Sequence, residues 1–265
     1  MNGWNYTERG SGRPLVLLHG GGSSARAWLP TMDRLAAQRR VIALDFPGFG
    51  ETSAVRGSVF AMDWAMHELA TELTRHGIEE PVDIAGNSMG GWFGLEAAQR
   101  GMARSVVAIS PAGLWARGMP SRIQIQFARA ACGAWIGNTP PLRYLLHVPA
   151  SRKRALSVSL AHADRMPAGD AIRKLQDLTR AVPTLLRMLG VVRRTRFEGG
   201  QHLTIPITVA FGTLDRMVLP GDSQFRDQLP THTRWLELPD VGHTPMGDAP
   251  DLIADTILTG TEIGM

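Results

Sequence analysis

The sequence is poor in cysteine. Its 265 residues contain a single cysteine, Cys132. One thiol cannot form an intrachain disulfide, which excludes a small secreted domain held together by disulfides. Cys132 lies in a predicted helix with no histidine or aspartate beside it, so we interpret it as a small apolar side chain of the core.

Long apolar runs and targeting signals are also lacking. No apolar run approaches the roughly 18 residues that a membrane-spanning helix requires. The stretch 1–8 lacks the basic region and apolar core of a signal peptide. We therefore predict a cytoplasmic protein without a membrane span. The composition, 44% hydrophobic and 20% charged, is typical of a globular protein with one large domain, with or without an insertion.

Acidic residues are scarce in one segment. The range 114–200 has 15 Arg and Lys residues against 4 Asp and Glu residues, whereas the rest of the chain has 13 against 20. This segment is therefore predicted to be a separate structural unit. Its basic excess is either a solvated helical surface or a positive rim that attracts an acidic substrate or partner. No nucleic-acid-binding motif accompanies the charge, so we predict no nucleic-acid partner.

Short apolar runs alternate with longer amphipathic patterns in the first half of the chain. Continuous apolar strands separated by helices are typical of a parallel sheet that is covered on both faces. The sequence therefore predicts an α/β fold with a mostly parallel, doubly wound sheet. The expected strands are 15–18, 41–44, 82–85 and 106–109, and the expected helices between them are 25–38 and 60–76.

The alternation stops near Pro111 and returns with a strand at 207–211. The stretch between them has a helical pattern with breaks at prolines. We predict a core formed by 1–113 and 201–265, with 114–200 inserted as a helical cap. The remaining expected elements are a helix at 222–229, a strand at 233–238 and a helix at 250–258.

The most informative motif is Gly86-Asn87-Ser88-Met89-Gly90, which follows the predicted strand at 82–85 and opens a helix. A serine on such a tight strand-to-helix corner projects its hydroxyl outward, and the following amide faces whatever the serine attacks. The partial positive charge of the helix N-terminus lies where an oxyanion would form. The alternative is an ordinary connection in which Ser88 caps the helix.

A serine nucleophile needs a base and an acid. His243 follows the last predicted strand, and Asp215 follows the strand at 207–211. Because the C-terminal ends of parallel strands share one edge of a sheet, both residues are expected at the edge that holds Ser88. Asp240 is nearer to His243 in sequence but is interpreted as a turn residue. The order Ser88, Asp215, His243 is the one expected for this architecture.

An oxyanion hole needs two donors near the developing charge. The N–H of Met89 is the first predicted donor. The second is Gly21, with Gly22 as the next choice, because both belong to the glycine run that follows the first central strand. That loop lacks the lysine of a phosphate-binding loop. We interpret His19 as a structural loop residue, and we predict no metal site.

The chain resembles the α/β-hydrolase fold superfamily, specifically serine hydrolases with a helical cap, over essentially the whole core. The resemblance implies acyl-enzyme hydrolysis without a cofactor and a cap after the sixth strand, which matches 114–200. Some relatives place the acid after the preceding strand, but 110–113 has no carboxylate. The matching motifs are His19-Gly20-Gly21-Gly22, Asp45-Phe46-Pro47-Gly48-Phe49-Gly50-Glu51-Thr52-Ser53, Gly86-Asn87-Ser88-Met89-Gly90-Gly91, Phe211-Gly212-Thr213-Leu214-Asp215 and Gly242-His243.

The resemblance also narrows the range of substrates that we expect. Similar haloalkane dehalogenases and epoxide hydrolases carry an aspartate where this chain has Ser88. The chain is similar to carbon–carbon bond hydrolases of aromatic ring cleavage, which have Pro-Gly where this chain has Ser23-Ser24 and tryptophan where it has Thr244. The favoured function is hydrolysis of small or medium, partly apolar carboxylic esters. A carbon–carbon hydrolase, an acyltransferase and a ligand-binding protein of the same fold remain alternatives.

Four aromatic residues are candidates for contact with a small-molecule substrate. An apolar cap over the site would suit a partly hydrophobic acyl or alcohol group. The competing interpretation is that these side chains pack within the core or the cap. The sequence leaves open whether the protein is a monomer or a dimer. The candidates are Trp92, Trp115, Phe127 and Trp135.

Overall fold

A computed structural model describes residues 3–55, 61–219, 221 and 224–262. Its centre is a seven-stranded sheet in the order β1-β3-β2-β4-β5-β6-β7. Strand β1 is antiparallel to β3, and all the other pairs are parallel. The strands are β1 (Tyr6–Arg9), β2 (Pro14–Leu18), β3 (Arg40–Leu44), β4 (Val82–Asn87), β5 (Ala103–Ile109), β6 (Ile207–Gly212) and β7 (Arg234–Leu238).

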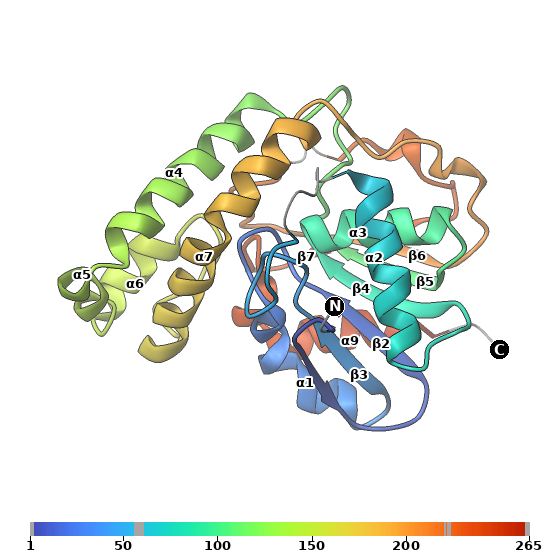
Figure 1. Cartoon of the computed structure of the whole chain (residues 1–265), viewed down its shortest axis with the longest axis horizontal. Helices are drawn as coiled ribbons and strands as arrows, with labels where there is room; N and C mark the ends of the chain where they lie inside the picture. The colour runs from blue at the N-terminus through green and yellow to red at the C-terminus, as the bar shows by residue number, and fades with distance from the viewer. Residues whose placement is uncertain (1–2, 56–60, 220, 222–223, 263–265) are drawn as a thin grey trace.

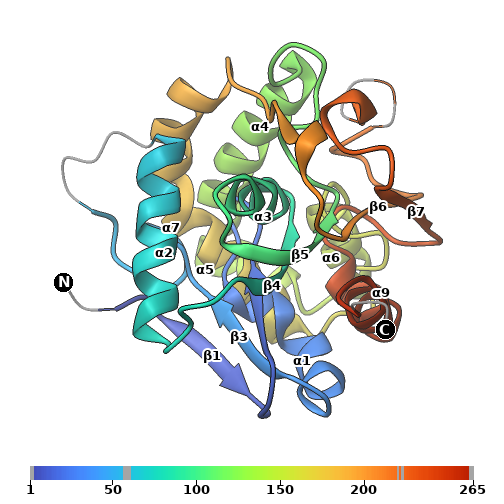
Figure 2. The ribbon, with the colours of Figure 1, turned by 90° about the vertical axis from the view of Figure 1, so that its right-hand side faces the viewer.

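Helices cover both faces of this sheet, as Figures 1 and 2 show. Alternate residues of a strand point to opposite faces, so Leu15 and Leu17 of β2 belong to one apolar cluster and Val16 and Leu18 to another. The predicted doubly wound α/β fold is confirmed. The helices against the sheet are α1 (Leu29–Ala36) and α9 (Pro250–Gly260) on one face, and α2 (Met62–Arg75) and α3 (Met89–Gln99) on the other.

A block of four helices, here called the helical insertion, lies between β5 and β6 in the chain and to one side of the sheet (Figure 1). Backbone and side-chain bonds join the two ends of this segment to each other: Phe197 N–H donates to Gly113 O at 3.0 Å, and Trp115 Nε1 donates to Thr195 O at 2.8 Å. The two connections are thereby held side by side next to the sheet. The helices are α4 (Ser121–Gly137), α5 (Pro140–Leu145), α6 (Pro149–Leu156) and α7 (Ala168–Val192).

Cys132 is exposed, which corrects the interpretation of this residue as a core side chain. The buried residues of α4 are Ile123 and Ala134. Each residue of an α-helix turns by about 100°, so Cys132 lies about 180° from Ile123 and about 200° from Ala134. The thiol therefore lies on the face of α4 that points away from its packing partner.

The helix expected at 222–229 is also wrong within the described residues. Only a 3₁₀ turn at Arg226–Gln228 forms there, and Asp222 lies outside the described residues. Phe225 has an extended backbone, and its N–H donates to Leu114 O at 2.8 Å. This tertiary bond replaces the turn that a helix would need. Of the expected helix at 60–76, Phe60 likewise lies outside the described residues, and α2 begins at Met62.

None of the helices in the described parts of the chain combines the length and the apolar character needed to span a bilayer.

Candidate active site

The Ser88 corner is a strained turn between β4 and α3. Ser88 has φ 53° and ψ −112°, a combination that side chains rarely adopt. Its N–H donates to Ile109 O at 2.9 Å, and its carbonyl accepts the N–H of Ala112 at 3.0 Å. Neighbouring β5 and the loop after it therefore hold the corner in place.

The two glycines of the motif are required by close backbone approach. A Cβ atom on Gly86 would overlap the carbonyl of Gly90, and a Cβ on Gly90 would overlap the carbonyl of Leu18. The strand and the helix meet at these positions with no room for a side chain. The motif is therefore dictated by packing as well as by chemistry.

Gly86→Ala is expected to lower the free energy of unfolding by roughly 3 kcal/mol, because the obstructing atoms belong to the backbone and cannot turn away. Gly190→Ala is the matched control, since a Cβ there meets nothing within 4 Å in the interior of α7. It should raise the stability by up to about 1 kcal/mol. Urea denaturation measures both values, and equal stabilities of the two variants would contradict this account.

His243 and Asp215 form a buried pair. The His243 Nδ1 atom lies 2.8 Å from Asp215 Oδ2. A carboxylate can only accept, so Nδ1 carries the proton and Nε2 is left as the basic nitrogen. The other carboxylate oxygen, Oδ1, accepts the N–H groups of Met217 at 2.7 Å and Val218 at 2.9 Å. This arrangement fixes the ring and its tautomer.

The carboxyl group of Asp215 stays ionised despite its burial. Burial alone would raise its pKa, but His243 and the N–H groups of Val218 and Met217 outweigh that effect and hold the pKa below its usual value. The carboxylate is therefore present across the neutral range. It can stabilise a positive charge on His243 when that ring takes a proton.

Asn87 ties the histidine loop to the nucleophile strand, a role that the sequence did not suggest. Its Nδ2 group donates to His243 O at 2.8 Å and to Ile109 O at 3.2 Å. One buried amide therefore links the end of β4 to the loop after β7. The only sequence signal was its position beside Ser88.

Asp240 lies away from the pair, as expected of a turn residue. Its side chain is 70% exposed and lies 2.9 Å from His162 Nε2. Its N–H donates to Thr213 Oγ1 at 3.0 Å, and its φ of 58° belongs to a tight turn. Asp240 therefore lies at the surface of the loop, and Asp215 is the carboxylate that contacts His243.

His19 is buried in the loop after β2 and bonds to the backbone on both sides of its ring. Its Nδ1 lies 2.8 Å from Gly20 O, and its Nε2 accepts the N–H of Phe46 at 3.1 Å. Burial lowers the pKa of His19, so the ring is neutral. Both nitrogens are occupied, which agrees with a structural role.

The predicted oxyanion donors lie close to Ser88. Met89 is the first residue of α3, and the first N–H groups of a helix have no partner within the helix. Gly21 lines the same two cavities as Ser88, whereas Gly22 lines only the larger one. A Cβ atom on Gly21 would lie 3.2 Å from Leu185 of α7. The glycine loop therefore runs between the nucleophile corner and the helical insertion.

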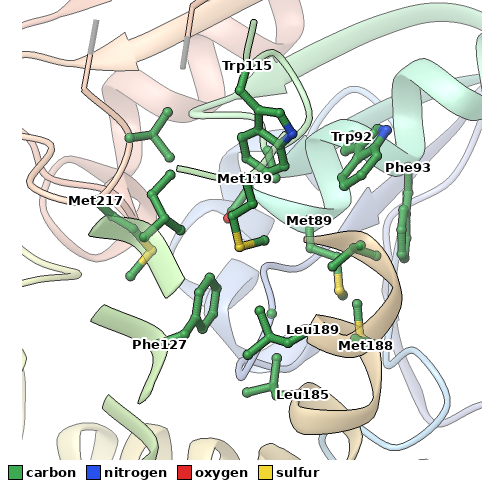
Figure 3. A pocket seen from close by; sticks show the side chains of 16 residues that line it. Met89, Trp92, Phe93, Trp115, Met119, Phe127, Leu185, Met188, Leu189 and Met217 are labelled. Atoms are coloured by element: carbon green, nitrogen blue, oxygen red, sulfur yellow. The ribbon is translucent and has the colours of Figure 1, made fainter. Parts of the chain in front are cut away.

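An apolar cavity adjoins Ser88. Figure 3 shows its side chains, and the labelled ones come from α3, from α4 and α7 of the helical insertion, from the segment before α4 and from the loop after β6. Three of the four predicted substrate contacts, Trp92, Trp115 and Phe127, line this cavity. Trp135 is 71% exposed and lines neither this cavity nor the larger one that includes His243. Helix α4 turns Trp135 outward. The other lining residues are Gly21, Met89, Phe93, Ala112, Met119, Ile123, Leu185, Met188, Leu189, Val192, Met217 and Val218.

A second, larger cavity also includes Ser88 and is lined in addition by His243. Its far wall is formed by α4, α5, α6 and α7 of the helical insertion. Thr244 N–H donates to Ser159 O at 2.7 Å, which joins the histidine loop to the segment after α6. Ser88 and His243 thus face a common space that is roofed by the insertion. Within the described residues no group of three or more His, Cys, Asp or Glu side chains could hold a metal ion.

Comparison with known proteins agrees with this architecture. A family model described as the alpha/beta hydrolase family matches residues 15–256. Epoxide hydrolase EphH of Mycobacterium tuberculosis is 33% identical over 195 residues, which cover 69% of this chain and 87% of that protein. A 2-hydroxy-6-oxo-2,4-heptadienoate hydrolase of Pseudomonas putida is 39% identical over 104 residues, 36% of each chain. The solved structure of a thermophilic esterase from Thermogutta terrifontis shares the fold with a TM-score of 0.74 at 20% identity, over 96% of this chain and 91% of that one. The chain therefore belongs to the alpha/beta hydrolase family.

Proposed function

We propose that this protein is a serine hydrolase that cleaves carboxylic esters of small or medium, partly apolar molecules. The observation that carries the proposal is the buried contact of 2.8 Å between His243 and Asp215, next to a cavity that His243 shares with Ser88. A serine hydroxyl requires such a base, and the base requires such an acid. Residues 114–200 would act as the cap over this site.

The proposed reaction has two halves. Ser88 Oγ attacks the ester carbonyl carbon while its proton passes to His243 Nε2. The N–H groups of Met89 and Gly21, or Gly22 as the second choice, stabilise the oxyanion of the tetrahedral intermediate. The C–O bond then breaks, and the leaving alcohol takes the proton from His243. A water molecule repeats these steps on the acyl-enzyme and releases the acid.

The chemistry of serine favours an acyl substrate over an epoxide, although one relative is named an epoxide hydrolase. Attack of a serine oxygen on an epoxide carbon would give an ether. An ether has no carbonyl group for water to attack, so the enzyme would stop after one turnover. An acyl-serine, in contrast, is hydrolysed by a second attack at its carbonyl.

A carbon–carbon bond hydrolase is the second candidate, supported by the local similarity to the 2-hydroxy-6-oxo-2,4-heptadienoate hydrolase of Pseudomonas putida. Such a reaction also passes an acyl fragment to water. Ser23, Ser24 and Thr244 differ from the pattern of that group, which favours the ester reaction. The absence of a cofactor and a cytoplasmic location stay predictions.

A substrate panel tests the proposal. It consists of p-nitrophenyl esters of increasing acyl length and a ring-cleavage product, each measured with and without an added alcohol or amine acceptor. Release of the free acid from the esters supports a hydrolase, whereas transfer to the acceptor supports an acyltransferase. Tight binding without any turnover would instead indicate a ligand-binding protein and would overturn the proposal.

A further inference from the structure

The larger cavity beside Ser88 is lined by cations. Arg129 of α4, Arg154 of α6 and Lys174 of α7 are among its lining residues, together with His243. None of the described residues that line it is Asp or Glu. The basic excess of the helical insertion is therefore not confined to the outer surface. It also faces the space next to the candidate nucleophile.

Lys174 is the most enclosed of these three cations. Its ammonium group forms no hydrogen bond or ion pair within the described ranges. Burial lowers its pKa to about 8, against the attraction of Asp177 and Asp248, so the side chain is still charged at neutral pH. A cation in partly apolar surroundings without a partner is costly unless a ligand supplies the opposite charge.

The two carboxylates that attract Lys174 are already bonded to other groups. Asp177 accepts the hydroxyl of Ser24 at 2.6 Å and pairs with Arg26 at 3.2 Å. Asp248 accepts three backbone N–H groups at 2.8 to 3.0 Å, from residues 161, 162 and 242. Both carboxylates serve to hold the loops together, and Lys174 is left facing the cavity.

Another basic residue of the insertion shows what a structural cation looks like in this protein. Arg152 of α6 is buried, and its guanidinium donates to the carbonyl groups of Leu146, His147 and Asp164 at 2.8 to 3.1 Å. Its two terminal nitrogens, Nη1 and Nη2, are both used within the fold. Lys174 has no such set of carbonyl partners, so the local structure does not account for its charge.

The two cavities differ sharply in character, and Ser88 lies where they adjoin. The smaller one is lined by apolar and aromatic side chains, whereas the larger one contains the three cations. A substrate that spans the nucleophile would place an apolar group in the first and an anionic group in the second. A carboxylate fits better than a dianion, because partly apolar walls penalise each additional charge.

We propose that the natural substrate carries a carboxylate in addition to the group that is cleaved, and that Lys174 selects it by pairing with that carboxylate in the larger cavity. The apolar remainder of the substrate occupies the smaller cavity. Arg129 and Arg154, which are exposed at the cavity wall, attract the anion from solvent. This inference rests on the proposed function in taking Ser88 as the reacting group.

A binding experiment tests the role of Lys174 without turnover. Calorimetry compares phenylbutyrate with its neutral amide, phenylbutyramide, which has the same apolar part. The unaltered protein is expected to bind the carboxylate at least about tenfold more tightly than the amide. Lys174→Met should abolish this preference, and Lys174→Arg should retain most of it. Lys153→Met, which removes an exposed cation of α6 outside both cavities, should leave it unchanged.

Equal binding of acid and amide, no measurable binding of either, or a preference that survives in Lys174→Met would overturn the inference. The thermal midpoint of each variant shows whether the fold is retained, and Lys174→Arg keeps the test decisive if the methionine variant unfolds. Turnover of paired esters, one with an added carboxylate and one with a neutral amide in its place, tests the anion site and the proposed hydrolase function separately. Turnover of esters without a preference for the carboxylate refutes the anion site alone, whereas selective binding without any turnover refutes the hydrolase proposal alone.

Discussion

Replacing Ser88 by alanine is expected to lower kcat for a p-nitrophenyl ester by about 10⁴-fold or more. The substitution removes the only atom that forms the acyl-enzyme and leaves the base, the acid and the oxyanion donors in place. Steady-state kinetics measure the loss. Turnover within about tenfold of the unaltered enzyme would show that Ser88 is not the nucleophile.

The same substitution should have little effect on stability, which separates loss of chemistry from loss of fold. Alanine keeps the Cβ atom, so the strain at φ 53° is the same as with serine. Ser88→Gly is the matched control, because glycine adopts this backbone conformation more easily and should raise the free energy of unfolding by about 1 kcal/mol. Both variants should be inactive. If Ser88→Ala loses much of its stability, its kinetics do not report on the nucleophile, and the kinetics of Ser88→Gly decide the question.

Asp215→Asn is expected to lower kcat by about 10⁴-fold. Oδ1 accepts the N–H groups of Met217 and Val218, so the oxygen of an asparagine would stay on that side and its NH₂ group would face His243 Nδ1. Nδ1 would then have to accept, and the ring proton would move to Nε2. A ring protonated at Nε2 cannot take the proton of Ser88.

Asp240→Asn is the control for that substitution. Its carboxylate is exposed and pairs with His162, so kcat should change by less than about twofold. The pH dependence of kcat for each variant shows whether a base is still present. A severe loss of activity in Asp240→Asn together with normal activity in Asp215→Asn would identify Asp240, and not Asp215, as the acid that supports His243.

The parts of the site that follow from strand–turn–helix geometry were accessible from the sequence. The glycines at 86 and 90 predicted a tight corner, and the structure explains them by backbone overlap on either side of Ser88. Asp215 and His243 were predicted together because the ends of parallel strands share an edge, although they are 28 residues apart. The central strands were predicted because continuous apolar runs of that length are typical of a sheet covered on both faces.

Features that depend on how the helical insertion packs were not accessible. A helical pattern does not say which face meets a neighbour, so Cys132 and Trp135 were placed inward although both are exposed. Lys174 gave no signal, since one lysine in a basic helix looks like a solvated charge. The role of Asn87 could not be predicted either, because its hydrogen bond to the His243 carbonyl joins elements that are distant in the chain.

The most direct test of the central claim is covalent labelling of the folded protein with a fluorophosphonate, followed by peptide mass spectrometry. The reagent reacts with a serine that an adjacent base has activated. We predict one adduct per chain, located on Ser88, and its loss in both Ser88→Ala and Asp215→Asn. No adduct on the folded protein, or an adduct on a different residue, would contradict the assignment of Ser88 as the nucleophile.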